Sequence, residues 1–171
     1  DSKVMLNLAN KSGINTPWLR PKKFSLDKSS SFEASLHAIE WFETNFFKID
    51  AIALFQPTSP FRSRIDFIKA LKKFKKSPER PLISIKKIGL KSDKILKKKN
   101  NFLTNLSKAK KGIDVYIPTG SFYIIKKTTL LKNKNFYSNE MNYFQIDNKL
   151  MNIDIDTPND YIIAKKLAPS M

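Results

Sequence analysis

The feature that most constrains this chain is the alternation of short apolar runs with helix-like stretches. Ser30 and Glu33 have the spacing of a capping box, and apolar residues follow them at helical intervals as far as Phe46. The run from Asp50 to Phe55 comes next; it is short and mostly apolar, which is typical of a strand covered on both faces in a parallel sheet. Strands that alternate with helices predict a single α/β domain with a mostly parallel sheet.

The same alternation continues toward the C-terminus. The proline-rich stretch 56–64 predicts a loop, and helical spacing resumes from Ile65 to Phe74. Further strands are predicted at 82–85, 121–125, 141–146 and 150–155, with a turn at 118–120 before the second of them. Further helices are predicted at 3–12, at 128–131 and from Thr157 onward, the first ended by Gly13 and the last opened by Pro158. Residues 92–101 show little apolar periodicity, and we expect a flexible excursion there.

The composition excludes several classes of protein. With 171 residues, of which 41% are hydrophobic and 12% aromatic, the chain can bury one core and is neither disordered nor fibrous. It has no cysteine, which excludes a disulfide framework and thiolate chemistry. No apolar run approaches the ~20 residues of a membrane-spanning helix, and no signal-peptide pattern is present. We therefore expect a cytoplasmic protein without a membrane partner.

The formal net charge of +17 points first to a polyanionic partner such as a nucleic acid. Four of the 32 basic residues are arginines, however, whereas phosphate and base recognition favours the bidentate guanidinium. Dispersed lysines usually form a solvated face. We expect no specific nucleic-acid site, and a basic binding module without catalytic activity remains the alternative from another functional class.

The loop after the run at 50–55 is a candidate ligand site. Ligands of open α/β sheets bind outside the carboxyl ends of the strands. The segment at that edge reads Leu54-Phe55-Gln56-Pro57-Thr58-Ser59-Pro60-Phe61-Arg62. It offers an amide, two hydroxyls and a guanidinium, and its two prolines limit its freedom. Composition alone is equally compatible with an ordinary strand-to-helix connection.

Asp154 and Asp156 form a second candidate site. Residues two apart on a strand project to the same face of the sheet. Close-set carboxylates at a strand end supply the hard oxygen ligands that Mg²⁺ prefers when it also binds substrate phosphates. Spacing alone leaves open the alternative that Asp156 merely ends the strand while Asp160 caps the last helix.

Several strings resemble, in the same order, motifs of the CMP-N-acylneuraminate synthetase family. They are Asp1-Ser2, Trp18-Leu19-Arg20-Pro21, Asp27 with Ser29 to Ser31, His37-Ala38-Ile39-Glu40, Gln56-Pro57-Thr58-Ser59-Pro60 followed by Arg62, Pro118-Thr119-Gly120-Ser121-Phe122-Tyr123-Ile124, and Ile153-Asp154-Ile155-Asp156-Thr157. Together they span essentially the whole chain. The resemblance implies a three-layer Rossmann-like sandwich of the nucleotide-diphosphosugar transferase type. It also implies a homodimeric cytidylyltransferase that transfers CMP from CTP to a nine-carbon 2-keto sugar acid and releases pyrophosphate.

The resemblance assigns expected roles to individual residues. The expected nucleotide and sugar contacts are Arg20, Ser31, Gln56, Thr58, Ser59, Thr119, Gly120, Phe136 and Tyr137. The expected catalytic residues are Asp154, Asp156 and Arg62, and the two aspartates would bind Mg²⁺. From the residues alone, Phe136 and Tyr137 are equally compatible with the core, and His37 is interpreted as structural.

The chain also departs from the family pattern. Thr119 stands where the family has Asn before Gly, and Ile117 stands where relatives often have Arg. Both departures fall at expected sugar or phosphate contacts, and Thr119 indicates a different nine-carbon acid. Sibling enzymes for legionaminic, pseudaminic or 3-deoxy-manno-octulosonic acid remain alternatives. The family's opening strand and glycine-rich phosphate loop have no counterpart after Asp1. We expect that roughly 60 residues precede it and that these 171 residues alone form an inactive, truncated fragment.

Overall fold

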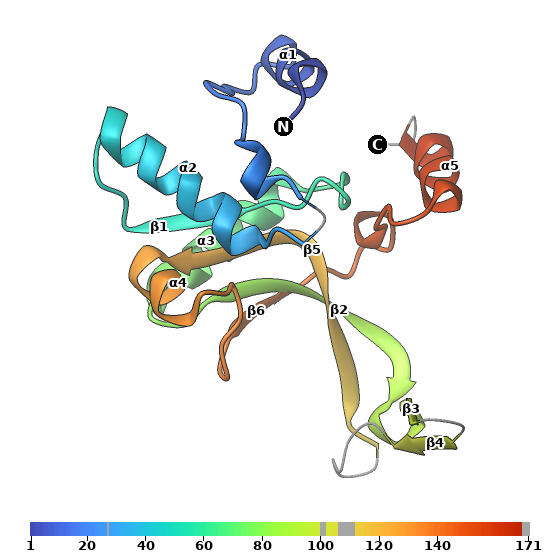
Figure 1. Ribbon diagram of the computed structural model, residues 1–171. Helices are drawn as coiled ribbons and strands as arrows, with labels where there is room; N and C mark the ends of the chain where they lie inside the picture. The colour runs from blue at the N-terminus through green and yellow to red at the C-terminus, as the bar shows by residue number, and fades with distance from the viewer. Residues whose placement is uncertain (27, 100–101, 106–111, 169–171) are drawn as a thin grey trace.

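The structure is a computed structural model that describes residues 1–26, 28–99, 102–105 and 112–168 (Figure 1). Its α-helices are α1 (Lys3–Lys11), α2 (Ser31–Asn45), α3 (Arg64–Lys76), α4 (Lys127–Asn133) and α5 (Pro158–Leu167). Its strands are β1 (Ala51–Leu54), β2 (Leu82–Lys91), β3 (Leu96–Lys99), β4 (Phe102–Asn105), β5 (Asp114–Lys126) and β6 (Asn142–Gln145). Short 3₁₀ turns are η1 (Lys22–Phe24), η2 (Ser92–Lys94) and η3 (Leu150–Asn152). Asp27, part of one sequence motif, lies outside the described residues.

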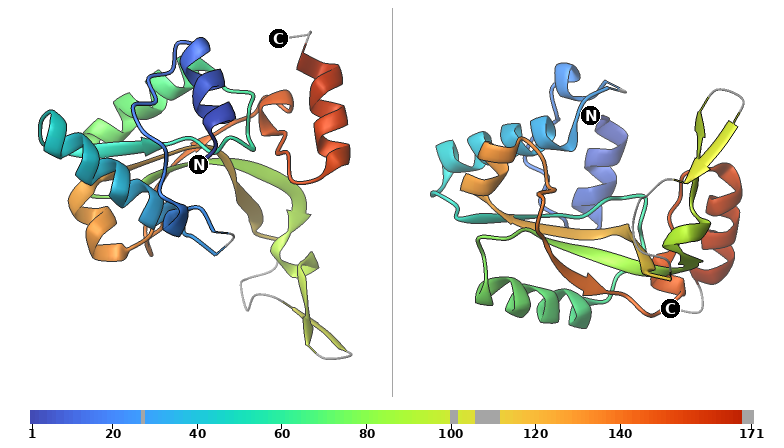
Figure 2. Two further views of the ribbon diagram at one scale, coloured as in Figure 1. Left: turned by 45° about the horizontal axis from the view of Figure 1, so that its top comes forward. Right: turned by 90° about the horizontal axis from the view of Figure 1, so that it is seen from below.

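Four strands form one sheet between two layers of helices. Their order is β1-β5-β2-β6, while β3 and β4 pair with each other in a separate two-stranded sheet. Seen from below, α2 and α4 cover one face of the larger sheet and α3 covers the other (Figure 2). The helices α1 and α5 stand at the top of Figure 1, close to the two ends of the chain. The α/β class and the three-layer arrangement therefore agree with the sequence prediction.

The predicted mostly parallel sheet is not confirmed. The pair β2–β6 is parallel, but β1–β5 and β5–β2 are antiparallel. It follows that β1, β2 and β6 run in one direction and β5 runs in the opposite direction between β1 and β2. The reason lies in the chain path: β2 leaves the sheet as one side of a long arm, and β5 returns along it. Apolar runs reveal that strands exist but carry no information about their direction.

The apolar core has two halves, one on each face of the sheet. Successive residues of β5 alternate between them, as expected for a pleated strand. Tyr123 and Ile125 pack in one cluster with Ile39 of α2. Phe122 and Ile124 pack in the other cluster with Phe74 of α3. Each fully buried side chain of this size stabilises the fold by roughly 1.5–3 kcal/mol, so the two clusters fix the helices against the sheet.

The predicted helix starts are confirmed because they depend on local chemistry. Ser30 and Glu33 form the capping box of α2, and Thr157 and Asp160 form that of α5. In each box the N-cap hydroxyl accepts a backbone N–H while the acidic side chain accepts the N-cap N–H. At the other end of α1, Gly13 has a φ of +79°, a conformation that favours glycine and ends the helix.

An ion pair ties the C-terminal half of α2 to the start of α4. Lys127 Nζ lies 2.6 and 2.8 Å from the two Glu43 carboxylate oxygens, and the Ile49 N–H donates to Glu43 at 3.0 Å. These interactions, the Lys127 hydrogen bond first, lower the pKa of Glu43 to about 2. The carboxylate therefore stays ionised over the whole ordinary pH range.

The prediction that residues 50–55 are covered on both faces is wrong, although β1 does form there. Ile52 and Leu54 are half-buried beneath α2, but Ala51 and Ala53 are exposed. In the described part of the sheet β1 is an edge strand, and α3 does not cover its second face. A four-residue apolar run is compatible with a central or an edge strand, so the sequence could not separate the two.

The strands β2 and β5 continue beyond the core as a projecting arm (Figure 1). The predicted turn at 118–120 is wrong, because these residues lie inside β5. Pro118 pairs with Ile85 where the β2–β5 register shifts, past the end of the β1 pairing, and irregular positions of this kind tolerate proline. Of the expected excursion at 92–101, the described residues include η2 and β3, and β3 pairs with β4 outside the main sheet. The expected flexibility of this segment stays a prediction. None of the helices in the described residues is long and apolar enough to cross a membrane.

Candidate functional site

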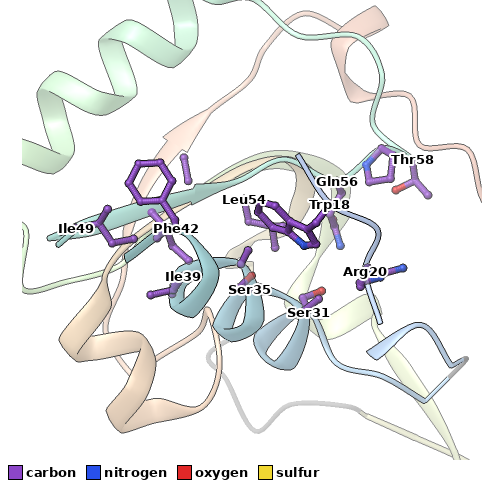
Figure 3. A pocket seen from close by; sticks show the side chains of 15 residues that line it. Trp18, Arg20, Ser31, Ser35, Ile39, Phe42, Ile49, Leu54, Gln56 and Thr58 are labelled. Carbon is purple, nitrogen blue, oxygen red and sulfur yellow. The ribbon is translucent and has the colours of Figure 1, made fainter. Parts of the chain in front are cut away.

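A hollow of ≈ 580 Å³ lies between α2, β1 and the loop after β1 (Figure 3). The polar side chains labelled at one end are Arg20, Ser31, Gln56 and Thr58. The apolar side chains labelled at the other end are Ile39, Phe42 and Ile49. Trp18 lies between the two groups, and its indole stacks on Trp41 with 4.2 Å between ring centroids. Four of the expected substrate contacts therefore share one amphipathic hollow.

Two local structures place the polar end of this hollow. Ser31 is the first residue of α2, directly after the capping residue Ser30. Gln56 follows the end of β1, and its N–H donates to the Gly120 carbonyl at 3.1 Å, which fastens the loop to β5. The Ser59 N–H then donates to the Gln56 carbonyl at 3.1 Å and closes a turn. The loop is thus anchored at both ends rather than free.

Arg20 supplies the cation at this end of the hollow. It is partly exposed, and one guanidinium nitrogen lies 3.2 Å from the Asp1 carboxylate while Nε donates to the Ser25 hydroxyl at 3.1 Å. These bonds hold the guanidinium in one orientation and use two of its five N–H donors. The remaining donors suit a phosphate or a carboxylate of a ligand.

A second hollow of ≈ 210 Å³ shares Ser31 and Gln56 with the first and is also lined by Phe136 and Tyr137. The Tyr137 hydroxyl donates to the Tyr123 hydroxyl at 3.3 Å, and that hydroxyl donates to Gln56 Oε1 at 3.3 Å. Burial raises the pKa of Tyr123, so the phenol stays a neutral donor. The Tyr123 hydroxyl thus uses the amide oxygen of Gln56 as its acceptor, and the NH₂ group of Gln56 remains available to donate to a ligand.

Phe136 fits both interpretations that the sequence allowed, a core residue and a residue at the site. It is buried in the core cluster beneath α2, and it also lines the second hollow. Tyr137 is exposed, and its ring meets that of Tyr123 edge to face with 5.8 Å between centroids. The aromatic pair is therefore positioned by the core and presents one edge to the hollow.

Gly120 allows the loop to approach β5. Its φ of +73° lies in the left-handed region, and a Cβ at this position would lie closer than 3.0 Å to Ser59 Oγ and Gln56 Oε1. Any side chain here would push both groups away. The glycine of the Pro-Thr-Gly string is thus required by close packing, and this explains its place beside the expected sugar contact Gln56.

Thr119 faces the interior of the protein. It is 3% exposed, and its hydroxyl donates to the Ser84 hydroxyl at 2.8 Å. Ser84 in turn bonds the backbone of Phe122, donating to its carbonyl at 3.0 Å and accepting its N–H at 3.1 Å. The hydroxyl at 119 therefore has a structural partner in β2. Its expected contact with the sugar acid stays a prediction.

Arg62 lies behind the loop. Its Nε donates to the Ser121 carbonyl at 3.0 Å, another guanidinium nitrogen bonds the Gln56 carbonyl, and the group lies over the Phe55 ring at 5.4 Å. Burial lowers the pKa of Arg62, but an arginine stays protonated at any ordinary pH. Arg62 therefore fastens the loop to β5, and its expected catalytic role stays a prediction.

The predicted strand at 150–155 is wrong, although the two aspartates are where a site could use them. Residues 150–152 form η3, and an extended but unpaired segment follows. Both Asp154 and Asp156 are exposed. The segment is held to the loop after β1, because the Ile155 N–H donates to the Thr58 carbonyl at 2.8 Å and Ser59 Oγ lies 3.2 Å from Asp154 Oδ1.

These carboxylates fit a magnesium ion in one respect. Neither Asp154 nor Asp156 forms an ion pair with any of the described residues, so their oxygens are not neutralised by a lysine or arginine. No group of three acidic or histidine side chains suited to a metal occurs in the described ranges. Mg²⁺ usually uses one or two carboxylates and completes its six ligands with water and substrate phosphates, so a two-carboxylate set is compatible with it.

Tyr123 and Trp18 were quoted in sequence motifs but not assigned to the site. Tyr123 is 5% exposed and occupies an inward position of β5, so its pattern was that of a core residue. Its hydroxyl is the signal that could have been used, since a buried phenol needs a polar partner. His37, interpreted as structural, does pack between aromatic rings, at 6.0 Å from Trp18 and 5.4 Å from Phe24.

Comparison with known proteins agrees with the motifs. No family model matches the chain. The chain is 28% identical over 174 residues to the CMP-N,N'-diacetyllegionaminic acid synthase of Legionella pneumophila, which covers 98% of the chain and 75% of that protein. It is 29% identical over 153 residues to the N-acylneuraminate cytidylyltransferase of Escherichia coli, which covers 85% of the chain and 35% of that protein. These matches confirm the resemblance inferred from the motifs: the chain is similar, along most of its length, to two CMP-sugar-acid synthetases.

Proposed function

We propose that this chain belongs to a cytidylyltransferase that transfers CMP from CTP to a nine-carbon 2-keto sugar acid and releases pyrophosphate. The observation that carries the proposal is the convergence at Gln56. Two hollows meet at this residue, one with Arg20 and the other with the Phe136–Tyr137 pair. The loop that Gln56 opens also holds Asp154 through Ser59. A cation-binding carboxylate, an anion-binding arginine and an aromatic hollow thus surround one amide.

The chemistry needs few groups from the protein. The anomeric hydroxyl oxygen forms a bond to the α-phosphorus of CTP, the bond to the β-phosphate oxygen breaks, pyrophosphate leaves, and the hydroxyl proton passes to water. Mg²⁺, when bound, would neutralise charge on the phosphate oxygens. Asp154 and Asp156 would hold it, and Arg20 would add a fixed positive charge near the phosphates. Positioning and charge stabilisation of this kind supply most of the acceleration in nucleotide transfer.

The second hollow supports recognition of the sugar acid. Its polar edge presents the NH₂ of Gln56 as a donor, because the amide oxygen accepts from Tyr123. Phe136 and Tyr137 supply apolar rings on the other side. An amphipathic sugar with acyl-bearing and hydroxyl-bearing edges matches this combination. The two relatives are named for N,N'-diacetyllegionaminic acid and N-acylneuraminate, and acids of these two types are therefore the first candidates.

We also propose that the chain acts as a homodimer. The arm of β2 and β5 projects from the sheet and exposes apolar side chains, namely Leu90, Ile113, Tyr116 and Ile117. Exposed apolar side chains on a projecting arm are typical of an interaction surface. Sedimentation equilibrium tests this proposal: a dimer is expected, and a monomer at high micromolar concentration would reject it.

The test of the sugar site compares two glutamines. Gln56→Leu removes the amide at the convergence point, whereas Gln145→Leu removes an exposed amide of β6 whose NH₂ bonds Asp147. We expect Gln56→Leu to raise the KM for the sugar acid about tenfold or more, because the variant loses one polar contact with the substrate. Gln145→Leu should leave it unchanged. Equal kinetics for the two variants would remove Gln56 from the site.

A further inference from the structure

We propose that Ser59 is a positioning residue, which orients the Asp154 carboxylate for a divalent cation. This inference rests on the proposed function, in which Asp154 and Asp156 hold that cation. It gives Ser59 a role different from the sugar contact that the sequence suggested.

The burial of Ser59 argues against direct contact with a ligand. Ser59 is part of the loop after β1 and is 0% exposed, and its side chain packs against Gly120 of β5. Its hydroxyl oxygen lies 2.6 Å from the Thr119 carbonyl and 3.2 Å from Asp154 Oδ1. A sugar acid could reach this hydroxyl only if the loop moved. Four hydrogen bonds hold the loop to β5 and to itself; their donors are the N–H groups of Gln56 and Ser59 and two guanidinium nitrogens of Arg62.

The Ser59 hydroxyl has one hydrogen but lies within reach of two acceptors, the Thr119 carbonyl and Asp154 Oδ1. A serine donates one O–H, whereas a carbonyl and an ionised carboxylate can only accept. The hydrogen can therefore serve the Thr119 carbonyl or Asp154, and the carboxylate gains a charge-assisted bond whenever it receives the hydrogen. The Ser59 hydroxyl thus lies at the junction between the β5 backbone and the candidate metal ligand.

The surroundings of Asp154 make this contact important for its orientation. The segment after η3 pairs with no strand in the described residues, and two bonds connect it to the loop. One is the backbone bond from Ile155 to Thr58, which fixes the chain but leaves the Asp154 side chain free to rotate. The other is the Ser59 contact, which restricts the carboxylate itself. Removal of Ser59 Oγ would leave the backbone in place and release the side chain.

Ser84 provides a matched control. It is also 0% exposed, and its hydroxyl also makes buried hydrogen bonds, to Phe122 and Thr119. It has no contact with Asp154. Ser84→Ala and Ser59→Ala therefore each remove one buried hydroxyl from the same polar cluster, and a general loss of stability should be similar in both.

The experiment measures the binding of Mn²⁺ alone, followed by the electron paramagnetic resonance signal of the free ion, with no nucleotide present. Groups that orient a metal ligand typically change metal affinity 10–100-fold when removed, so we expect about tenfold weaker binding in Ser59→Ala. Ser84→Ala should bind Mn²⁺ as the unaltered chain does. Ser59→Cys keeps a weak donor and should lie between the two; it carries the test if the alanine variant does not fold.

Asp154→Asn separates this inference from the function on which it rests. If Asp154→Asn binds Mn²⁺ normally, the metal site itself is rejected and the inference falls with it. If Asp154→Asn loses binding but Ser59→Ala and Ser59→Cys retain it, the positioning role alone is rejected. A loss that Ser84→Ala shares equally would also reject it, because the effect would then come from stability.

Discussion

Replacement of Gly120 by alanine tests the packing on which the site depends. Gly120 combines two demands, a φ of +73° and close contact with the Ser59 and Gln56 side chains. A non-glycine residue in the left-handed region costs about 1–2 kcal/mol. The new Cβ also displaces the buried Ser59 hydroxyl from its acceptors, and a buried polar group without a partner costs about 1–3 kcal/mol. We therefore expect a loss of roughly 2–5 kcal/mol in the free energy of unfolding.

Two other glycines separate these contributions. Gly13 has a φ of +79° but nothing within 4 Å of an added Cβ, so Gly13→Ala reports the backbone cost alone. Gly89 has neither a positive φ nor a close neighbour, so Gly89→Ala should change stability by less than about 0.5 kcal/mol. The assay is urea unfolding with a common m value, which identifies changes in stability as such.

We also expect the substitutions at Gly120 and Ser59 to be coupled. In the double variant Ser59→Ala, Gly120→Ala the hydroxyl is already gone, so the added methyl meets less resistance. The combined loss should be about 1 kcal/mol smaller than the sum of the single losses. If Gly120→Ala is no more destabilising than Gly13→Ala, or if the two changes are additive, the close packing described above does not exist in solution.

Three further predictions concern charge. Asp154→Asn and Asp156→Asn should each lower kcat on the order of 10²–10³-fold; near-normal turnover at low Mg²⁺ would remove them as metal ligands. The pKa of Glu43 lies near 2 in the folded protein and 4.5 is its ordinary value, so its stabilisation is complete above pH 4.5 and is lost as the pH falls from there toward 2. In Glu43→Gln the urea midpoint of unfolding should depend less on pH between 4.5 and 2 than in the unaltered protein. An unchanged pH dependence would contradict this role of Glu43. Binding of duplex DNA should be weak, independent of sequence and steeply reduced by salt; tight, sequence-dependent binding at physiological salt would make a nucleic acid a true partner.

Features that depend on neighbours in the sequence could be predicted from it. The capping boxes at Ser30 and Thr157 involve side chains three residues apart, so their chemistry is complete in a short string. The glycine that ends α1 is of the same kind. These helix ends were therefore readable before any tertiary contact was known.

Features that depend on distant neighbours could not be predicted in this way. Residues 153–156 look like a strand by alternation, but their backbone bonds the loop at Thr58 rather than another strand. The predicted strands at 82–85 and 121–125 stop short of the outer parts of β2 and β5, yet these parts pair with each other, and Lys87 of β2 forms an ion pair with Asp114 of β5 at 2.6 Å. In both cases the deciding partner lies far away in the sequence, so local propensity gives no signal.

The candidate site shows the same division. The family motifs indicated which residues to examine, and the structure places Arg20, Ser31, Gln56 and Thr58 around one hollow. The burial of Ser59 and Thr119 had no local signature, because a serine or threonine beside a proline or glycine is usually exposed in a turn. Their contacts depend on β5 approaching the loop, which in turn depends on Gly120.

Cytidylyltransferase activity is measured directly as pyrophosphate release from CTP by the protein with Mg²⁺ and a panel of 2-keto sugar acids. The panel should include N-acetylneuraminic, N,N'-diacetyllegionaminic, pseudaminic and 3-deoxy-manno-octulosonic acids. We predict that pyrophosphate release requires CTP and one of the nine-carbon acids. Gln56→Leu should slow this release, and Gln145→Leu should leave it unchanged. A protein that unfolds cooperatively, yet releases no pyrophosphate with any acid of the panel, would contradict the account.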